Sequence, residues 1–139
     1  IVDASMVKAG INKKILSSFG GKVICFIDNE DIAKLSSRLN ITRSILAMRR
    51  AAKLMDGGIV AIGNAPTALF ELCDLIDEGK AKPSLVIGVP VGFVGAKESK
   101  KRLRTLQIPY ITNRSRHGGS SVAAACVNAL LKIAERGGK

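Results

Sequence analysis

Two glycine-rich segments hold the residues whose types and spacing are best suited to chemistry. Residues 63–69 read Gly-Asn-Ala-Pro-Thr-Ala-Leu and follow the β-branched run 59–62. Residues 88–100 read Gly-Val-Pro-Val-Gly-Phe-Val-Gly-Ala-Lys-Glu-Ser-Lys and follow the apolar run 85–87. In α/β proteins, a strand followed by a glycine turn and a helix forms a ligand pocket at the carboxyl ends of the strands. We therefore predict that both turns line a binding site.

The two glycine turns do not match the common nucleotide-binding motifs. A P-loop needs a glycine, four further residues and then Gly-Lys-Ser/Thr, but Gly95 is followed by Ala96 before Lys97. The dinucleotide motif G-x-G-x-x-G does not occur, and Gly92 with Gly95 supplies only its second half. The turns still suit an anion, because the helix that follows presents free N–H groups and a positive dipole end. A tight turn without a ligand is the alternative that these residues leave open.

Arginines form the second group of candidate residues. Arg43 falls in the first turn of a helix expected to begin after Thr42, where a cation opposes the helix dipole. This misfit favours a carboxylate-binding role, since a guanidinium binds carboxylate through two parallel hydrogen bonds. Arg114 and Arg116 precede two glycines and two serines, a pattern that suits an anion clamp at a helix start. We interpret His117, in the same loop, as an ordinary exposed histidine because no nearby carboxylate would orient it.

The composition predicts one domain, residues 1–139, with an aliphatic core and a strong positive charge. Hydrophobic residues make up 47% of the chain and aromatic residues only 4%, so Ile, Val, Leu and Ala must fill the interior. The net charge of +11 favours an anionic partner, which a nucleic acid, an anionic membrane or a polycarboxylate ligand would provide. The basic stretch 96–106 could bind a phosphate backbone, but no nucleic-acid-binding module or stacking aromatics accompany it. A solvated basic surface is the remaining alternative.

The cysteines and the single histidine bear on compartment and metal binding. Cys25, Cys73 and Cys126 lie far apart in apolar contexts, and their odd number excludes a full disulfide framework. We therefore expect reduced core thiols in a cytoplasmic protein. His117 has no cysteine at ligand spacing, so no metal site is expected. No apolar run reaches the length of a membrane span, and no membrane partner is expected.

Strand and helix patterns alternate along the chain and predict an α/β fold. Apolar, β-branched runs predict strands over 22–27, 59–62, 84–88 and 110–112. Helical spacing and end signals predict helices over 42–55, 66–79, 96–106 and 120–135, and residues 29–39 suit a short helix or an irregular connection. This order favours a mostly parallel sheet with helices on both faces, a Rossmann-like arrangement of three layers.

Taken together, the motifs resemble those of the precorrin isomerase (precorrin-8X methylmutase) family from end to end of the chain. Residues 3–7 match the family's Asp-x-x-Met-Val segment, and residues 40–44 match its Asn-x-x-Arg-Ser element. The two glycine-rich segments and the loop 114–120 match its remaining motifs in the right order. The resemblance implies that substrate is bound by Asp3, Asn12, Arg43, Ser44, Asn64, Thr67, Gly92, Gly95, Ser99, Arg114, Arg116 and Ser120.

The resemblance also implies an activity. Family members are isomerases that move a methyl group between adjacent ring C carbons of a corrin precursor in cobalamin biosynthesis. They need no separate cofactor, form homodimers, and bind a tetrapyrrole with several carboxylates, which suits the positive charge better than nucleic acid does. Their catalytic histidine lies upstream of the segment matched at Asp3, so we expect an N-terminal segment to be missing here and assign no catalytic residue. A relative that binds a corrinoid without isomerising it is the alternative, and a basic nucleic-acid-binding domain is a third hypothesis.

Overall fold

A computed structural model describes residues 1–137 and contains one parallel sheet. Its three strands lie in the order β1-β2-β3. They are β1 (Ile59–Ile62), β2 (Leu85–Gly88) and β3 (Tyr110–Thr112). Val60 pairs with Val86, which in turn pairs with Tyr110, and all three strands run in the same direction. Val2 forms a single parallel bridge to Ala61 and extends the sheet beyond β1.

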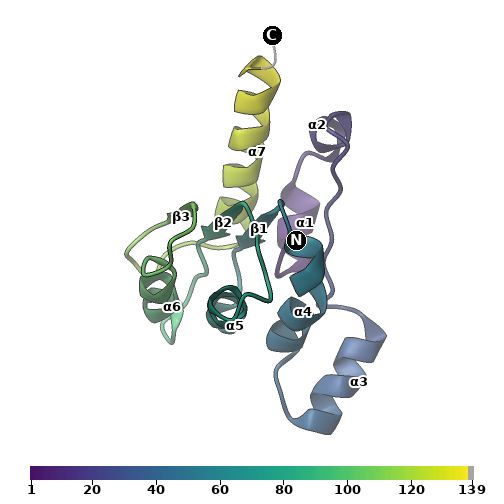
Figure 1. Cartoon of the computed structure of the whole chain (residues 1–139), viewed down its shortest axis with the longest axis vertical. Helices are drawn as coiled ribbons and strands as arrows, with labels where there is room; N and C mark the ends of the chain where they lie inside the picture. Colours follow the sequence, from purple (N-terminus) through teal and green to yellow (C-terminus); the bar gives the residue numbers. More distant parts are fainter. Residues whose placement is uncertain (138–139) are drawn as a thin grey trace.

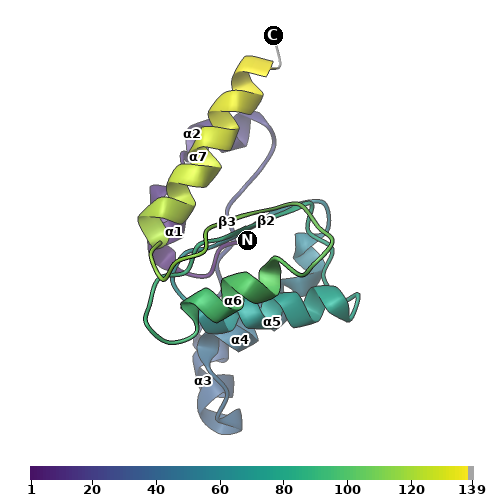
Figure 2. The same ribbon diagram turned by 90° about the vertical axis from the view of Figure 1, so that its left-hand side faces the viewer.

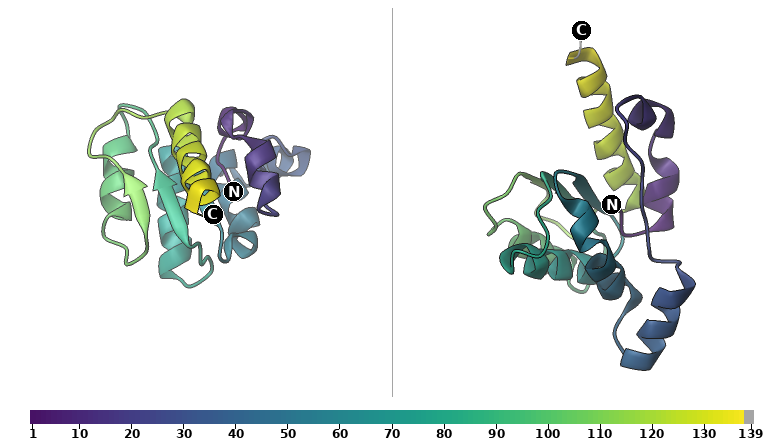
Figure 3. Two further views of the ribbon diagram at one scale, coloured as in Figure 1. Left: turned by 90° about the horizontal axis from the view of Figure 1, so that it is seen from above. Right: turned by 45° about the vertical axis from the view of Figure 1, so that its right-hand side comes forward.

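Helices cover both faces of this sheet. They are α1 (Ser5–Gly10), α2 (Lys13–Ser18), α3 (Glu30–Leu39), α4 (Arg43–Ala51), the 3-10 helix η1 (Ala52–Met55), α5 (Pro66–Asp77), α6 (Ala96–Leu103) and α7 (Ser120–Gly137). Helices α4, α5 and α6 lie on one face, and α7 rises from the other (Figures 1 and 2). Seen from above, α7 lies over the sheet with α1 and α2 beside it (Figure 3). The structure confirms the prediction of a parallel sheet between helices.

Alternate residues of the strands point into two separate apolar cores. Val60 and Ile62 of β1 pack with Leu72 of α5 on one face. Ala61, between them, packs with Ala123 of α7 on the other. A strand buried on both faces must be apolar at every position, which explains the near-continuous aliphatic runs of the sequence.

The prediction of a strand over residues 22–27 is wrong. This segment is extended, but the sheet position beside β1 belongs to the first residues of the chain. The Val2 N–H donates to the Ile24 carbonyl (3.0 Å), and one such bond is too little to make residues 22–27 a strand. The prediction also missed α1 and α2. Residues 29–39, for which a short helix or an irregular connection was expected, form a helix. It begins at Glu30, and Asn40 ends it in the left-handed conformation.

The other predicted elements are confirmed with small changes at their ends. Strands β1 and β3 have the predicted bounds, and Pro66 is the first residue of α5. The helix expected over 42–55 changes to 3-10 geometry at Ala52, and α6 stops at Leu103 rather than 106. Within residues 1–137, no helix is long and apolar enough to cross a membrane.

Candidate functional site

The turns that follow the three strands meet at the carboxyl edge of the sheet, as the sequence predicts for a pocket. The turn after β1 begins at Gly63, where an added Cβ would lie 2.7 Å from the Gly119 carbonyl oxygen and 2.8 Å from the Ser120 Cα. The start of α7 therefore packs directly on the end of β1. The turn after β2 touches the same place, since a Cβ at Gly95 would lie 3.3 Å from the Pro66 Cβ. Segments far apart in the sequence thus form one surface.

Backbone hydrogen bonds join the loop after β2 to the loop after β3. The Gly92 N–H donates to the Arg116 carbonyl (3.1 Å), and the Gly119 N–H donates to the Val89 carbonyl (3.0 Å). A Cβ at Gly118 would lie only 2.1 Å from the Val89 carbonyl oxygen. Only glycine permits this approach. The Gly-Gly pair that looked like part of an anion clamp is therefore also what lets the two loops touch.

Asp3 holds the turn after β1 in place. Its carboxylate is buried and accepts hydrogen bonds from the N–H groups of Gly63 (3.0 Å), Asn64 (2.9 Å) and Ala65 (2.7 Å). Burial raises the pKa of Asp3 above its ordinary value, although the three backbone bonds oppose this. All of these bonds go to the protein's own backbone. The structure thus gives Asp3 the part of a buried anchor beneath the turn rather than a side chain open to a ligand.

The starts of α4 and α5 contribute a polar pair at the edge of this surface. The Ser44 and Thr67 hydroxyl oxygens lie 3.1 Å apart, at hydrogen-bonding distance. Arg43, next to Ser44, is exposed, and none of the ion pairs found within residues 1–137 includes it. Asn64 is also exposed, at the turn itself. These four residues leave a cation and several hydrogen-bonding groups available beside the first glycine turn.

Arg114 and Arg116 lie exposed on the loop after β3. The Arg116 guanidinium sits over the Phe93 ring, 4.8 Å from its centroid. Phe93 is 86% exposed and Val94 is 90% exposed, so an apolar tip adjoins the arginines. A cation over an aromatic ring is held in place without losing its charge. The two loops therefore offer both positive charge and apolar surface.

Two predicted residues lie elsewhere. Asn12 caps α2, its side chain accepting from the Ile15 N–H (3.1 Å), and its own N–H donates to the Asn128 side chain of α7 (2.8 Å). It is not among the turns described above. Ser99 is fully buried on α6, and its hydroxyl donates to the Ala96 carbonyl (2.9 Å). The structure thus places the glycine turns, the arginines, Ser44, Thr67 and Ser120 at this edge of the sheet, but it places Asn12 elsewhere and buries Ser99.

Sequence reasoning missed the part played by Lys100, which it counted only as one charge of a basic helix. The side chain is fully buried, and its Nζ donates to the carbonyls of Ser115 and His117, both at 2.7 Å. Desolvation lowers the pKa of Lys100 below its ordinary value. A signal was present, because Lys100 stands four residues after Ala96 and three before Leu103, both buried on the same helix face.

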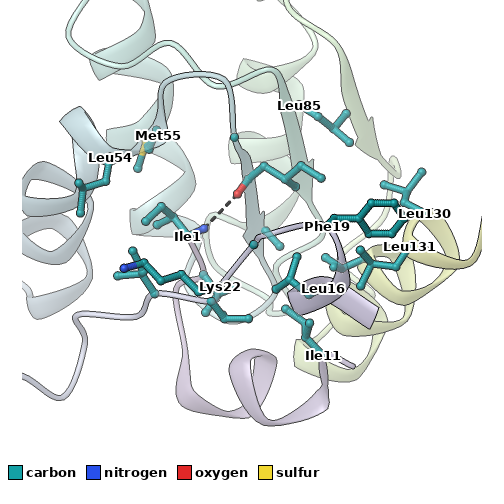
Figure 4. A pocket seen from close by; sticks show the side chains of 18 of the residues that line it. Ile1, Ile11, Leu16, Phe19, Lys22, Leu54, Met55, Leu85, Leu130 and Leu131 are labelled. Carbon is teal, nitrogen blue, oxygen red and sulfur yellow. Dashed lines mark hydrogen bonds between the residues drawn. The ribbon is translucent and has the colours of Figure 1, made fainter. Parts of the chain in front are cut away.

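An apolar cavity lies at the opposite, amino-terminal edge of the sheet. It measures about 560 Å³ and is lined by β1 and β2 at their first residues and by α2, the segment 21–24 and the second half of α7. Figure 4 shows Leu16, Phe19 and Leu131 along its wall, with the Ile1 nitrogen donating to the Ile59 carbonyl (3.0 Å). The candidate residues do not line it. Within residues 1–137, no three His, Cys, Asp or Glu side chains are grouped to hold a metal ion.

Comparison with known proteins supplies the context for this geometry. Residues 1–133 match the family model of precorrin-8X methylmutase. The chain is 52% identical to a cobalt-precorrin-8 methylmutase of Priestia megaterium over 137 residues, covering 99% of this chain and 61% of that protein. It is 45% identical to a precorrin-8X methylmutase of Pseudomonas aeruginosa, covering 94% of this chain and 63% of that protein.

Solved structures agree with the sequence matches. The crystal structure of a precorrin-8X methylmutase from Thermus thermophilus superposes with a TM-score of 0.88 at 38% identity, covering 99% of this chain and 66% of that one. A precorrin-8X methylmutase related protein gives a TM-score of 0.83 at 32% identity, covering 95% of this chain and 69% of that one. The chain thus spans about three fifths of the length of the curated relatives named above.

Proposed function

This chain belongs to the precorrin-8X methylmutase family, and we propose that it forms the greater part of a corrin-precursor isomerase. The reaction moves a methyl group between adjacent ring C carbons, so no atom is gained or lost. We propose this activity for the protein to which these residues belong, and substrate binding for residues 1–139 as a single domain. The observation that carries the proposal is the meeting of both family glycine turns with the Arg114–Arg116 loop on one edge of the sheet.

The exposed arginines would bind the carboxylates at the rim of the macrocycle. Arg43 lies beside the first glycine turn, while Arg114 and Arg116 lie beside the second. The proposed substrate is a macrocycle bearing carboxylates, so it needs cations at its rim and apolar contact on its face. Phe93 and Val94, exposed between the arginines and the turn, offer that contact. The net charge of +11 would in addition attract a polyanionic substrate over a distance.

We assign no proton transfer to His117. Its side chain is exposed, and its carbonyl and N–H are engaged by Lys100 and by the Ser115 hydroxyl. No described interaction orients its ring. In the family, the general acid is a histidine upstream of the segment matched at Asp3, so we assign that role to no residue of this chain. Binding by this chain and turnover by the protein are therefore separate measurements.

The test is an absorbance titration of the chain with the metal-free corrin product, hydrogenobyrinic acid, at low and high salt. Arg43→Ala should weaken binding by about 1.5–3 kcal/mol, about 10-fold to 150-fold, if the guanidinium makes a charge-assisted bond. Arg38→Ala, an exposed arginine in the last turn of α3, is the matched control and should bind like wild type. Equal affinities of wild type and Arg43→Ala would remove Arg43 from the site. A chain that ignores the corrin but binds duplex DNA in a strongly salt-dependent way would support the nucleic-acid hypothesis instead.

We also propose a homodimer in the cytoplasm. The exposed apolar pair Phe93 and Val94 beside the site is one surface that a second copy could cover. All three cysteines are unpaired, which suits a reducing compartment. Sedimentation equilibrium of the wild type decides the first point, since a mass of one chain at all concentrations would contradict a dimer.

A further inference from the structure

The strongest feature that the proposed function leaves unused is the buried cation of α6. Four residues of this short helix are fully buried, at the spacing of one helix face, and the largest of them is Lys100. The other three are Ala96, Ser99 and Leu103. Every other basic residue of the helix is exposed or half-buried. Burying a lysine costs free energy unless its charge is compensated, so a specific reason for it is needed.

The compensation of Lys100 comes entirely from one loop. Its Nζ donates to the Ser115 and His117 carbonyls, both at 2.7 Å, and none of the ion pairs within residues 1–137 includes it. The chain thus supplies two dipoles but no carboxylate. These two carbonyls belong to the residues on either side of Arg116. With the carbonyls drawn inward, the loop turns its arginine side chains toward solvent, where Arg114 and Arg116 are found.

Other contacts hold the same loop from other sides, but only Lys100 bonds it with a buried charge. The Asn113 side chain donates to the His117 carbonyl (3.0 Å), and Arg104 donates to the Asn113 carbonyl (3.3 Å). The Gly92 N–H holds the Arg116 carbonyl (3.1 Å). Arg104 also bonds through a charge, but with one hydrogen bond at 3.3 Å from a half-buried side chain, whereas Lys100 makes two at 2.7 Å from a buried one. Charge-assisted bonds are shorter and stronger than neutral ones, so Lys100 holds the loop more strongly than the other contacts do.

We infer that Lys100 is a positioning residue that holds the loop 113–119 in the shape in which Arg114 and Arg116 bind an anionic ligand. It acts through the backbone and does not itself touch the ligand, being fully buried. The identity of the ligand rests on the proposed function, a corrin polycarboxylate. The inferred shape of the loop is independent of the proposed function, because Lys100 makes its two hydrogen bonds within the protein itself.

The test compares Lys100→Met with two matched variants of the full chain. Lys101→Met removes an exposed charge from the same helix, and Leu103→Val removes a buried methylene from it without touching the loop. Hydrogen exchange, followed by mass spectrometry, reports opening of 113–119 against the start of α7. Titration with hydrogenobyrinic acid reports affinity, and thermal melting reports stability.

Lys100→Met should exchange in 113–119 about tenfold faster than wild type and lose at least about tenfold in affinity, because a displaced loop misplaces both arginines. Lys101→Met should change affinity less than about twofold, since an exposed charge contributes little. Leu103→Val should lower the melting temperature but leave the exchange of residues 113–119 at the wild-type rate. If Lys100→Met does not fold, Lys100→Gln, whose amide NH2 can still donate hydrogen bonds but carries no charge, should show smaller increases in exchange and smaller losses of affinity.

Two results would overturn the inference. The first is exchange of residues 113–119 in Lys100→Met at the wild-type rate. The second is a loss of corrin affinity in Leu103→Val as large as that in Lys100→Met, when the two variants have the same melting temperature. If the wild type itself does not bind the corrin, the proposed function fails instead. The exchange of 113–119 then decides the role of Lys100 by itself.

Discussion

Replacing Gly118 by alanine should separate the two loops that form the second half of the site. The new Cβ would lie 2.1 Å from the Val89 carbonyl oxygen, whereas real Cβ contacts stay beyond 3.0 Å. Both atoms are held by backbone, so the loops must move apart by at least 0.9 Å, the difference between these distances. The two bonds across the gap are now 3.0 Å (Gly119 to Val89) and 3.1 Å (Gly92 to Arg116). Each would stretch beyond about 3.5 Å and be lost.

The expected cost follows from those two bonds. At about 0.5–1.5 kcal/mol each, their loss lowers the free energy of unfolding by about 1–3 kcal/mol. For a chain of 139 residues this corresponds to a fall in melting temperature of about 3–12 °C. Urea unfolding measures the first quantity and calorimetry the second. Amide exchange by NMR locates the damage, because the Gly92 and Gly119 amides should lose their protection.

Gly119→Ala is the matched control for Gly118→Ala. Its φ of +127° strains an alanine, but no heavy atom lies within 4 Å of the added Cβ. This variant should lose stability through backbone strain while the Gly92 amide stays protected. A Gly118→Ala protein that keeps its Gly92 amide protected, or that unfolds within about 0.5 kcal/mol of wild type, would refute the steric reasoning.

Two further predictions concern buried titratable groups. Asp3→Ala should lower the free energy of unfolding by about 2–4 kcal/mol, because the buried Gly63 N–H loses its acceptor and two more N–H groups are left to water. Burial raises the pKa of Asp3 above 3.8, so the stability that Asp3 contributes is complete below pH 3.8 and shrinks as the pH rises through the raised pKa. A difference in the free energy of unfolding between wild type and Asp3→Ala that grows from pH 4 to pH 7 would contradict this. Cys73 is fully buried and burial raises the pKa of its thiol to about 12, so iodoacetamide should label it only after unfolding. Labelling of native Cys73 at the rate of half-buried Cys126, measured by mass spectrometry, would contradict that prediction.

Local patterns were enough to predict most of the fold. The runs 59–62 and 110–112 are apolar and bounded by turn residues, and the strands have those bounds. Pro66 and the Asp-Gly-Gly at 56–58 mark helix ends, because proline lacks an N–H and glycine tolerates left-handed backbone. The same reasoning gave a wrong prediction for residues 22–27. It has strand composition, but the partner position beside β1 was taken by Val2, and pairing is decided by neighbours rather than by propensity.

The sequence by itself determined the strands and helices that alternate along the chain, the two glycine turns and the arginine-bearing loop, because each is encoded by residues adjacent along the chain. Only the tertiary structure decided that Asp3 lies beneath the turn at Gly63, sixty residues away, and that Lys100 bonds the carbonyls of Ser115 and His117. An aspartate and a lysine look like solvated charges in a sequence. Their roles arise from desolvation and from backbone groups brought close by folding, and these leave no local pattern beyond the buried spacing of one helix face.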